Sequence, residues 1–333
     1  MSDAAFRAAI PPVAPGRPRP LWSVMIPTYH CAAYLEETLG SVLAQDPGPG
    51  RMQIEVVDDH SVRDDPEIVV DAVGRGRVSF FRQPANLGVA GNLTTCLLRS
   101  RGRLVHLLHG DDAVRDGFYR RLQQAFDTSP DIGAAFCRHI FMDEHGHWSG
   151  LSPLEAPARG VLADALVRLA SEQRIMAPSI VVRRHVYERL GGFDRRLVCS
   201  EDWEMWVRIA ARAPVWYETE PLALYRMHTE SNTGRHVRTG EDIRYTRDAI
   251  AMFAAYLPAD VAERVVTRAR RTYARAALRM AEACLARGDV DAVAAQAREA
   301  LALSRAPRVL AHIAHLAVRG CLRGAARAYS GSR

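Results

Sequence analysis

The adjacent carboxylates Asp111 and Asp112 are the residues of this sequence best placed to do chemistry. They follow an apolar run, residues 104–108, in which His106 is the one polar side chain. Such a run predicts a strand that is buried on both faces, and Gly110 lets the chain turn out of it. Open α/β sheets bind their ligands at the carboxyl ends of strands, where two carboxylates suit Mg²⁺ or Mn²⁺. An aspartate in this place can also cap a helix, and the pair alone leaves both roles open.

Two more acidic pairs stand at the ends of predicted elements. The pair Asp58-Asp59 follows a second apolar run, and the pair Glu201-Asp202 follows Ser200, the predicted N-cap of a helix. A carboxylate at a helix start stabilises the exposed N–H groups, but it can equally act as a general base. All three pairs are therefore candidates for one site, provided that the fold brings them together.

Strands and helices alternate along the part of the chain that carries the first two pairs. Strands are predicted at residues 21–26, 52–57, 78–81 and 104–108. Helices are predicted between and after them, at residues 32–45, 65–74, 91–100 and 117–127. This alternation predicts an α/β fold with a Rossmann-like, mostly parallel sheet flanked by helices. Farther along, strands are predicted at 132–137, 179–184 and 215–225, and helices at 161–172, 184–190 and 200–210.

The sequence divides into three regions. Residues 1–20 are rich in proline and arginine and predict a flexible or extended leader. Residues 21–240 carry the α/β pattern. Residues 241–333 predict helices alone, and their small-residue stripes, broken at Gly288-Asp289, resemble one tetratricopeptide-like unit. One unit is too few for a solenoid, so we expect a small all-α appendage.

The fixed positive charge of the chain comes from arginine alone, because the sequence contains no lysine. A P-loop lysine, a Schiff base and a lysine general base are therefore excluded. Residues 260–333 hold 14 Arg against six acidic residues, a net charge of +8, so the other 259 residues sum to −2 of the total of +6. The basic tail suits either peripheral contact with an anionic membrane or a solvated helix surface. It lacks interleaved aromatic residues, so we expect no specific nucleic-acid binding.

Hydropathy and cysteine usage bear on the cellular compartment. No run of about 18 apolar residues predicts a transmembrane helix, and the first 20 residues lack the apolar core of a secretory signal. The six cysteines are scattered without a Cys-x-x-Cys motif, as in reduced intracellular proteins. We therefore expect a cytoplasmic protein, and whether its basic tail reaches the inner face of the membrane stays open.

Six short motifs, in one order along the chain, resemble those of family 2 glycosyltransferases of the GT-A fold. They are Ser23–Tyr29, Glu55–Ser61, Asn86–Asn92, Leu107–Asp112, Gly191–Asp194 with Glu201-Asp202, and Tyr225–His228. The resemblance spans roughly residues 21–235 and leaves the helical tail uncovered. It implies an inverting enzyme that moves a sugar from a nucleotide-diphosphate-sugar donor to a hydroxyl of a carbohydrate or lipid-linked acceptor. A Rossmann dehydrogenase is excluded, because no Gly-x-Gly-x-x-Gly follows the first strand.

The same resemblance implies which residues bind the nucleotide sugar. Asp59 is expected to accept the imide N–H of the donor base, with Pro27 and Tyr29 flanking that base. Asp58 is expected either to bind the ribose or to cap the next helix. The remaining positions of the implied donor site are Asn86, Gly88, Asn92 and Asp111.

The resemblance also implies a divalent metal, Mn²⁺ or Mg²⁺, that bridges the diphosphate of the donor. Asp112, together with Asp111, is the expected ligand pair. The family often has a further aspartate where this chain has His109, so one carboxylate is missing and strict metal dependence stays open. His228 is the candidate for a further ligand, because imidazole suits Mn²⁺ better than Mg²⁺; an ordinary loop histidine is the alternative.

The same resemblance implies that residues 201–202 carry out catalysis. Asp202 is the expected general base, since inverting transfer needs a carboxylate that deprotonates the acceptor hydroxyl. Glu201 is the second choice, and helix capping is the alternative role for both. Trp203 is expected to offer a platform for an acceptor sugar. If these residues are not catalytic, the chain is a GT-A-like scaffold that acts through its basic helical tail.

Overall fold

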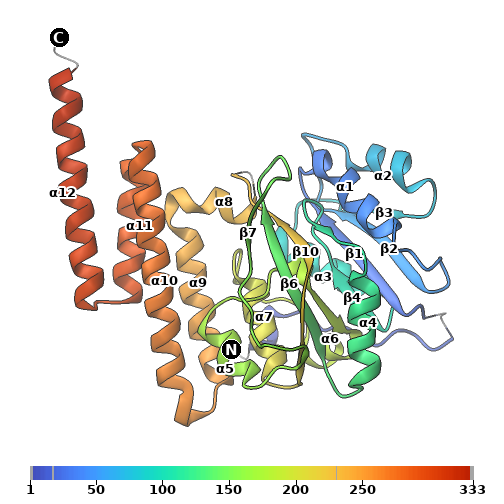
Figure 1. The fold of residues 1–333 in the computed structure, drawn as a ribbon. Helices are drawn as coiled ribbons and strands as arrows, with labels where there is room; N and C mark the ends of the chain where they lie inside the picture. The colour runs from blue at the N-terminus through green and yellow to red at the C-terminus, as the bar shows by residue number, and fades with distance from the viewer. Residues whose placement is uncertain (1–2, 17–18, 230, 331–333) are drawn as a thin grey trace. The chain divides into compact units, whose positions relative to one another are not determined.

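The computed structural model describes residues 3–16, 19–229 and 231–330 (Figure 1). These residues form two compact units. The first comprises the chain up to residue 169 together with residues 173–228, and the second comprises residues 170–172 and the chain from residue 229 onward. The predicted domain boundary between residues 240 and 241 falls just before a helix, whereas the second unit already begins at residue 229.

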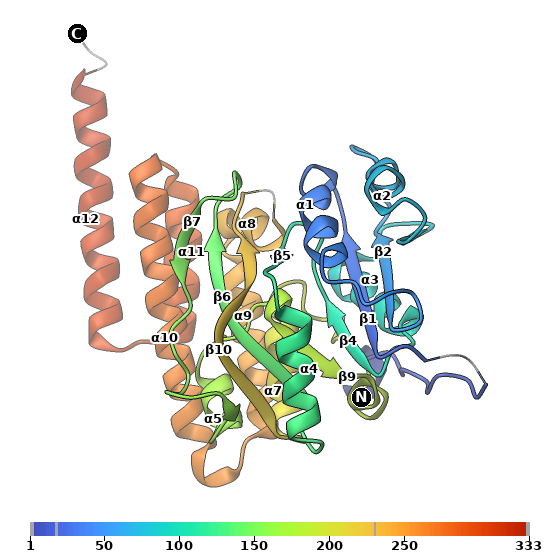
Figure 2. The ribbon, with the colours of Figure 1, turned by 45° about the vertical axis from the view of Figure 1, so that its right-hand side comes forward.

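The first unit is built on one mixed sheet of ten strands (Figure 2). The strand order is β3-β2-β1-β4-β9-β6-β10-β5, with β7 paired to β6 and β8 paired to β10. The parallel half contains β1 Trp22–Thr28, β2 Met52–Asp58, β3 Ser79–Arg82 and β4 Leu104–Leu107. The other half contains β5 Ala113–Val114, β6 Ala134–Met142, β7 Trp148–Leu151, β8 Gly160–Val161, β9 Ile180–Arg183 and β10 Val215–Arg226.

Helices cover the sheet because their apolar residues recur at helical spacing. Within α1 Ala32–Leu43, for example, Leu35, Leu39 and Val42 are fully buried. The helices α1, α2 and α4 share one core cluster with alternate strand residues, and α3 packs on β1, β2 and β4 from the other face. The remaining bounds are α2 Pro66–Gly74, α3 Gly88–Arg99, α4 Phe118–Thr128, α5 Ala165–Ser171, α6 Arg184–Leu190 and α7 Glu201–Ala210.

The predicted α/β sheet is confirmed, but not all strands of its second half run in the same direction as β1 to β4. Strands β1 to β4 run parallel, as the alternation with helices predicts. Strand β9 lies antiparallel to both of its neighbours, β4 and β6. Hydrophobic periodicity identifies a strand but not its direction, so this reversal was not visible in the sequence. The helix predicted at 161–172 begins only at Ala165, because residues 160–161 pair with β10.

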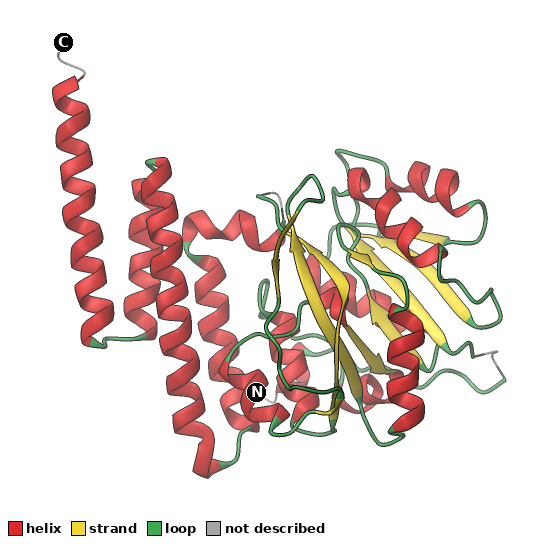
Figure 3. Ribbon diagram, in the orientation of Figure 1, coloured by secondary structure: helices red, strands yellow, loops and turns green. Residues whose placement is uncertain are grey.

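The second unit is helical (Figure 3). Gly288 ends the long helix with a left-handed φ of 81°, and the carboxylate of Asp289 caps the next helix by accepting from the Ala292 N–H. The structure supports helical character here and nothing that is specific to a tetratricopeptide repeat. Among the described residues, no helix has the length and apolar character needed to cross a membrane. The bounds are α8 Asn232–His236, α9 Glu241–Phe253, α10 Ala259–Arg287, α11 Val290–Leu303 and α12 Pro307–Ser330.

Part of the predicted leader is an ordered piece of the first unit. Arg7 donates hydrogen bonds to Asp194 Oδ2 and Glu204 Oε1, both at 3.1 Å, and both carboxylates are fully buried. The carbonyl of Ala8 accepts from the Gly192 N–H at 2.8 Å. The expectation of a flexible leader is therefore wrong at these residues, because a buried carboxylate pair holds the arginine in place.

Replacing Arg7 with alanine should lower the free energy of unfolding of the first unit by about 2 kcal/mol. The loss stays below that of a wholly unpaired buried charge, because Arg196 still contacts Asp194 and Arg208 still contacts Glu204. Urea unfolding followed by tryptophan fluorescence measures this unit alone, since all five tryptophans lie in it. The exposed Arg51→Ala control should change the value by less than about 0.5 kcal/mol, and an equal change in both variants would contradict the assignment.

Candidate active site

The end of β1 lies between two of the predicted acidic pairs. The N–H of Asp59 donates to the Thr28 carbonyl at 2.9 Å, and the N–H of Gly110 donates to the Pro27 carbonyl at 3.0 Å. Strands β2 and β4 are the two parallel neighbours of β1. The carboxyl ends of these strands therefore meet at one edge of the sheet, where a doubly wound fold binds ligands.

The two aspartates after β2 have different surroundings. Asp58 is fully buried and accepts from the Ser61 N–H at 3.1 Å, from the Ser61 hydroxyl at 2.6 Å and from Arg82 Nε at 2.9 Å. The next helix, α2, is capped by Asp65, so Asp58 does not take the capping role and instead holds the turn after β2. Asp59 Oδ1 accepts from the Leu87 N–H at 2.8 Å, and burial raises the pKa of Asp59 to about 6 although its backbone hydrogen bonds lower it. Asp59 thus holds the residue that precedes α3.

The amides of the predicted donor loop bond to the protein backbone. Asn86 Nδ2 donates to the Asp59 carbonyl at 3.2 Å, and the buried Asn92 donates to the Val57 carbonyl at 2.9 Å. Gly88 opens α3 with a left-handed φ of 73°, a conformation that favours glycine. These residues shape the loop, whereas Tyr29, 37% exposed after β1, has a surface open to a ligand.

His109, Asp111 and Asp112 form a cluster suited to a metal ion. One possible ligand atom from each lies within 4.8 Å of the others. Asp112 Oδ1 accepts from the Arg226 N–H at 2.9 Å, while its Oδ2 is buried and has no hydrogen-bond partner among the described residues. A buried carboxylate oxygen without a partner costs free energy, which a bound cation would offset.

The protonation of this cluster fits a metal site. Burial lowers the pKa of His109, so its imidazole is neutral and has a lone pair for a cation. Burial, followed by the charge of Asp111, raises the pKa of Asp112 well above its usual range. Burial also opposes ionisation of Asp111, but the hydrogen bond from His228 holds its pKa below the usual value. One imidazole and two carboxylates are a donor set that suits Mn²⁺.

Two histidines lie near the pair Asp111-Asp112. His109 stands where the family often has an aspartate, and its ring belongs to the cluster. His228 Nε2 lies 3.0 Å from Asp111 Oδ2, where it could orient this carboxylate. The sequence did contain a signal for His109, since it stands two residues before Asp111 at the end of the buried strand β4.

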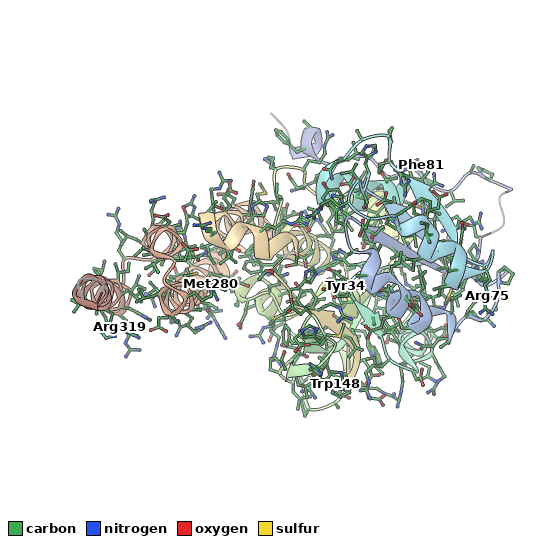
Figure 4. The ribbon with its side chains drawn as sticks, turned by 90° about the horizontal axis from the view of Figure 1, so that it is seen from above. Tyr34, Arg75, Phe81, Trp148, Met280 and Arg319 are labelled. Carbon is green, nitrogen blue, oxygen red and sulfur yellow. The ribbon has the colours of Figure 1, made fainter. Side chains whose placement is uncertain are left out.

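Arg226, at the end of β10, holds the loop of this cluster in place. Its Nε donates to the Asp111 carbonyl at 2.8 Å, and its backbone N–H bonds Asp112. The guanidinium also bonds Glu37 of α1 and lies 4.6 Å from the ring centroid of Tyr34, which Figure 4 labels. Sequence reasoning missed this residue because a buried arginine cannot be told from an exposed one by its type.

The pair Glu201-Asp202 opens α7, as predicted. Gln173 Nε2 donates to both oxygens of Asp202, at 3.0 and 2.9 Å. Burial raises the pKa of Asp202 to about 6, although hydrogen bonds from Trp203 and Gln173 lower it. Burial, followed by the charge of Asp202, raises the pKa of Glu201 well above its usual range, and Glu201 Oε2 has no partner among the described residues.

Ser200 is the N-cap residue of α7, as predicted, but its φ of 64° is left-handed and its side chain makes no capping hydrogen bond. A second local prediction, on Trp203, is wrong. Trp203 is 1% exposed, and its indole N–H donates to the Leu169 carbonyl at 2.6 Å. Neither face of this ring is open to a sugar, so Trp203 does not fit the acceptor platform that we expected.

Tyr225 shows that the acidic pairs of β4 and α7 converge. Burial raises the pKa of this phenol, and so do four nearby negative charges, those of Asp112, Asp202, Asp111 and Glu201. The cluster after β4 and the candidate base therefore both lie near this side chain. Asp59 follows β2, which pairs with β1 on the side away from β4.

Comparisons with known proteins agree with this geometry. The model of Glycosyl transferase family 2 matches residues 23–191, and that of Glycosyltransferase like family 2 matches residues 158–246. The Mycobacterium tuberculosis protein MT1568 is 29% identical over 237 residues, which are 68% of this chain and 73% of that protein. The Methanocaldococcus jannaschii glycosyltransferase MJ1057 is 25% identical over 198 residues, 58% of this chain and 66% of that protein.

Solved structures share the fold. S. aureus TarS 1–349 in complex with UDP-GlcNAc superposes with a TM-score of 0.60 at 16% identity, over 75% of this chain and 71% of that chain. The mannosyltransferase PcManGT from Pyrobaculum calidifontis, in complex with GDP-Man and Mn²⁺, superposes with a TM-score of 0.53 at 18% identity, over 96% and 89%. Identities this low establish the GT-A fold alone.

The match to Glycosyl transferase family 2 runs from β1 to the end of α6 and covers more than half of the chain. It includes the acidic pairs after β2 and β4 and the end of β1, which lies between them. The chain therefore belongs to glycosyl transferase family 2.

Proposed function

We propose that this glycosyltransferase inverts the anomeric carbon of a nucleoside-diphosphate sugar, with Asp202 as the general base. The observation that carries the proposal is the convergence of Asp202 with Asp111 and Asp112 around Tyr225. A base and a diphosphate site have to lie on opposite sides of the reacting carbon in a single displacement. The acceptor is proposed to be a carbohydrate or lipid-linked hydroxyl.

The reaction needs one proton transfer and one substitution at carbon. Asp202 takes the proton of the acceptor hydroxyl while the acceptor oxygen forms a bond to the anomeric carbon. The bond from that carbon to the diphosphate oxygen breaks, and its electron pair leaves with the nucleoside diphosphate. Because attack comes from the face opposite the leaving group, the configuration inverts.

The environments of Asp202 and Glu201 support Asp202 as the base. With a pKa near 6, Asp202 is ionised at neutral pH, and Gln173 orients both of its oxygens. Glu201 has its pKa well above the usual range, so its neutral form dominates unless a cation lies close by. The reaction requires an ionised carboxylate, and Glu201 is less often ionised than Asp202 at neutral pH. Glu201 is therefore the weaker candidate for the base.

We propose that the donor nucleotide binds next to the loops that follow β1 and β2. Asp59 would accept from the base, with Pro27 and Tyr29 flanking it, and Asn86, Gly88 and Asn92 would shape the loop behind. His109, Asp111 and Asp112 would hold a divalent cation, with His228 orienting Asp111. When bound, such a cation offsets the charge that develops on the leaving diphosphate.

Replacing Asp202 with asparagine should lower kcat by a factor of about 10² to 10⁴, because asparagine cannot accept the proton. Release of nucleoside diphosphate from a panel of nucleotide sugars, with Mn²⁺ present, measures the effect. The variant should still bind the nucleoside diphosphate, as measured by the rise in its melting temperature when the ligand is added. The exposed Asp116→Asn variant is the isosteric control and should retain wild-type activity.

Loss of activity in Glu201→Gln with little change in Asp202→Asn would contradict the assignment of the base. Retained nucleotide binding without turnover of any donor in the wild type would instead favour a GT-A-like scaffold.

The acid limb of the kcat/KM profile, which reports the free enzyme, should lie near pH 6, since Asp202 has to be ionised to act and its pKa is raised to about 6. Replacing Gln173 with leucine removes hydrogen bonds that lower this pKa, so the limb should move to higher pH. Steady-state kinetics from pH 5 to 9 measure the shift. If activity falls equally at every pH and the limb does not move, the hydrogen bonds from Gln173 do not set the pKa of the base.

Replacing His109 with aspartate should shift the metal preference from Mn²⁺ toward Mg²⁺, because a carboxylate is a harder ligand than imidazole. The ratio of activities with the two metals should change at least about fivefold. His145→Asp, in the exposed turn between β6 and β7, is the matched control and should leave the ratio unchanged. An unchanged ratio in His109→Asp would exclude His109 as a ligand.

A further inference from the structure

A groove runs between α10 and the start of α12 in the second unit. It has a volume of about 1130 Å³, and arginine is the commonest residue along it. Four arginines on α10 line one side, Arg264, Arg268, Arg271 and Arg275, and Arg308 of α12 lies across from them. None of these residues belongs to the active site of the first unit.

The α10 arginines form a single stripe because their spacing follows the helix. Steps of four, three and four residues return to the same face of an α-helix. At 1.5 Å per residue the stripe from Arg264 to Arg275 is about 16 Å long. Asp260 and Glu263 also line the groove, near the start of the same helix, and limit the basic stretch at that end.

These five arginines have no acidic partner in the part of the chain that the structure describes. Elsewhere in the second unit, arginines do pair: Arg238 with Asp289, Arg244 with Glu241, and Arg247 with Glu299. In the groove, Arg275 Nε bonds only the carbonyl of Arg271. Guanidinium groups gathered in this way repel one another, and a bound anion would offset that repulsion.

The side chains of the groove select among anions. Guanidinium is planar and bonds phosphate oxygens in pairs, so a row of arginines suits a ligand with more than one phosphate. No Phe, Tyr or Trp lines the groove, so the ring of His312 is the one aromatic surface that its lining offers to nucleic-acid bases. The groove also has an apolar part, formed by Leu278, Ala306, Pro307 and Val309.

We propose that the groove between α10 and α12 binds an anion that carries two or more phosphate groups. The phosphates can come from a soluble oligophosphate or from the headgroups of an anionic phospholipid surface. This site is separate from the donor site, so its test does not depend on the proposed transfer reaction.

The test measures binding of inorganic tripolyphosphate to the full chain by calorimetry at low salt, with a chelator present to remove divalent metals. Arg268→Glu with Arg271→Glu reverses two groove charges, and the affinity should fall at least about tenfold. The matched control is Arg270→Glu with Arg298→Glu, since both arginines are exposed, neither lines the groove, and the net charge changes equally. The control should stay within about threefold of the wild type.

A second arm identifies the source of the phosphate. Co-sedimentation with vesicles of equal parts phosphatidylglycerol and phosphatidylcholine, against pure phosphatidylcholine, should show groove-dependent binding if lipid headgroups are the ligand. If tripolyphosphate binds through the groove and vesicles do not, the source is soluble. Arg319 of α12, an exposed arginine outside the groove that Figure 4 labels, remains in all variants.

Three outcomes would overturn the proposal. The first is that neither tripolyphosphate nor anionic vesicles bind. The second is an equal loss in the groove variant and its control, which would make net charge alone responsible. The third is groove-dependent binding of single-stranded RNA without binding of the other two ligands. Circular dichroism of each variant checks that the helices persist.

Discussion

A carboxylate buried in protein needs a cation or hydrogen-bond donors, and the buried acids of the first unit meet this need to different degrees. Asp58, Asp194 and Glu204 are fully buried, and each has its own arginine contacts. Asp112 and Glu201 are almost as buried, yet each has one carboxylate oxygen with no partner among the described residues. The protein therefore stabilises the first three carboxylates by itself, whereas a cation or a proton would offset the cost of burying the other two.

Rigid neighbours make such incomplete groups useful. Arg226 bonds the carbonyl of Asp111 and the carboxylate of Asp112, and the same guanidinium bonds Glu37 of α1. Gln173 holds both oxygens of Asp202 from outside α7. Carboxylates that are fixed before a ligand arrives lose little freedom when it binds, and this lowers the free-energy cost of reaching the reactive geometry. Asp112 is thus held in place by Arg226 although its Oδ2 has no partner among the described residues.

The sequence predicted the order of strands and helices and the acidic pairs at their ends, because those depend on local patterns. It predicted that the pairs after β2 and β4 would meet, since parallel neighbours end at one edge. It did not predict the direction of β9, the docking of Arg7 or the burial of Trp203. Each of these depends on contacts between residues far apart in the chain, such as Arg7 with Glu204, and no local pattern records them.

The two histidines show where reasoning from residue type reaches its limit. The sequence predicts His228 as a further ligand because imidazole suits Mn²⁺ better than Mg²⁺. In the structure His109 clusters with Asp111 and Asp112 just after β4, and His228 lies 3.0 Å from Asp111. Burial keeps its ring neutral, which an aspartate in the same place would achieve only by taking up a proton. A neutral third ligand reduces the repulsion within the cluster before a cation binds, and it reduces the preference for Mg²⁺ over softer ions. With a histidine in place of a carboxylate the cluster offers a donor set that suits Mn²⁺, and the hydrogen bonds from Arg226 hold its loop in place.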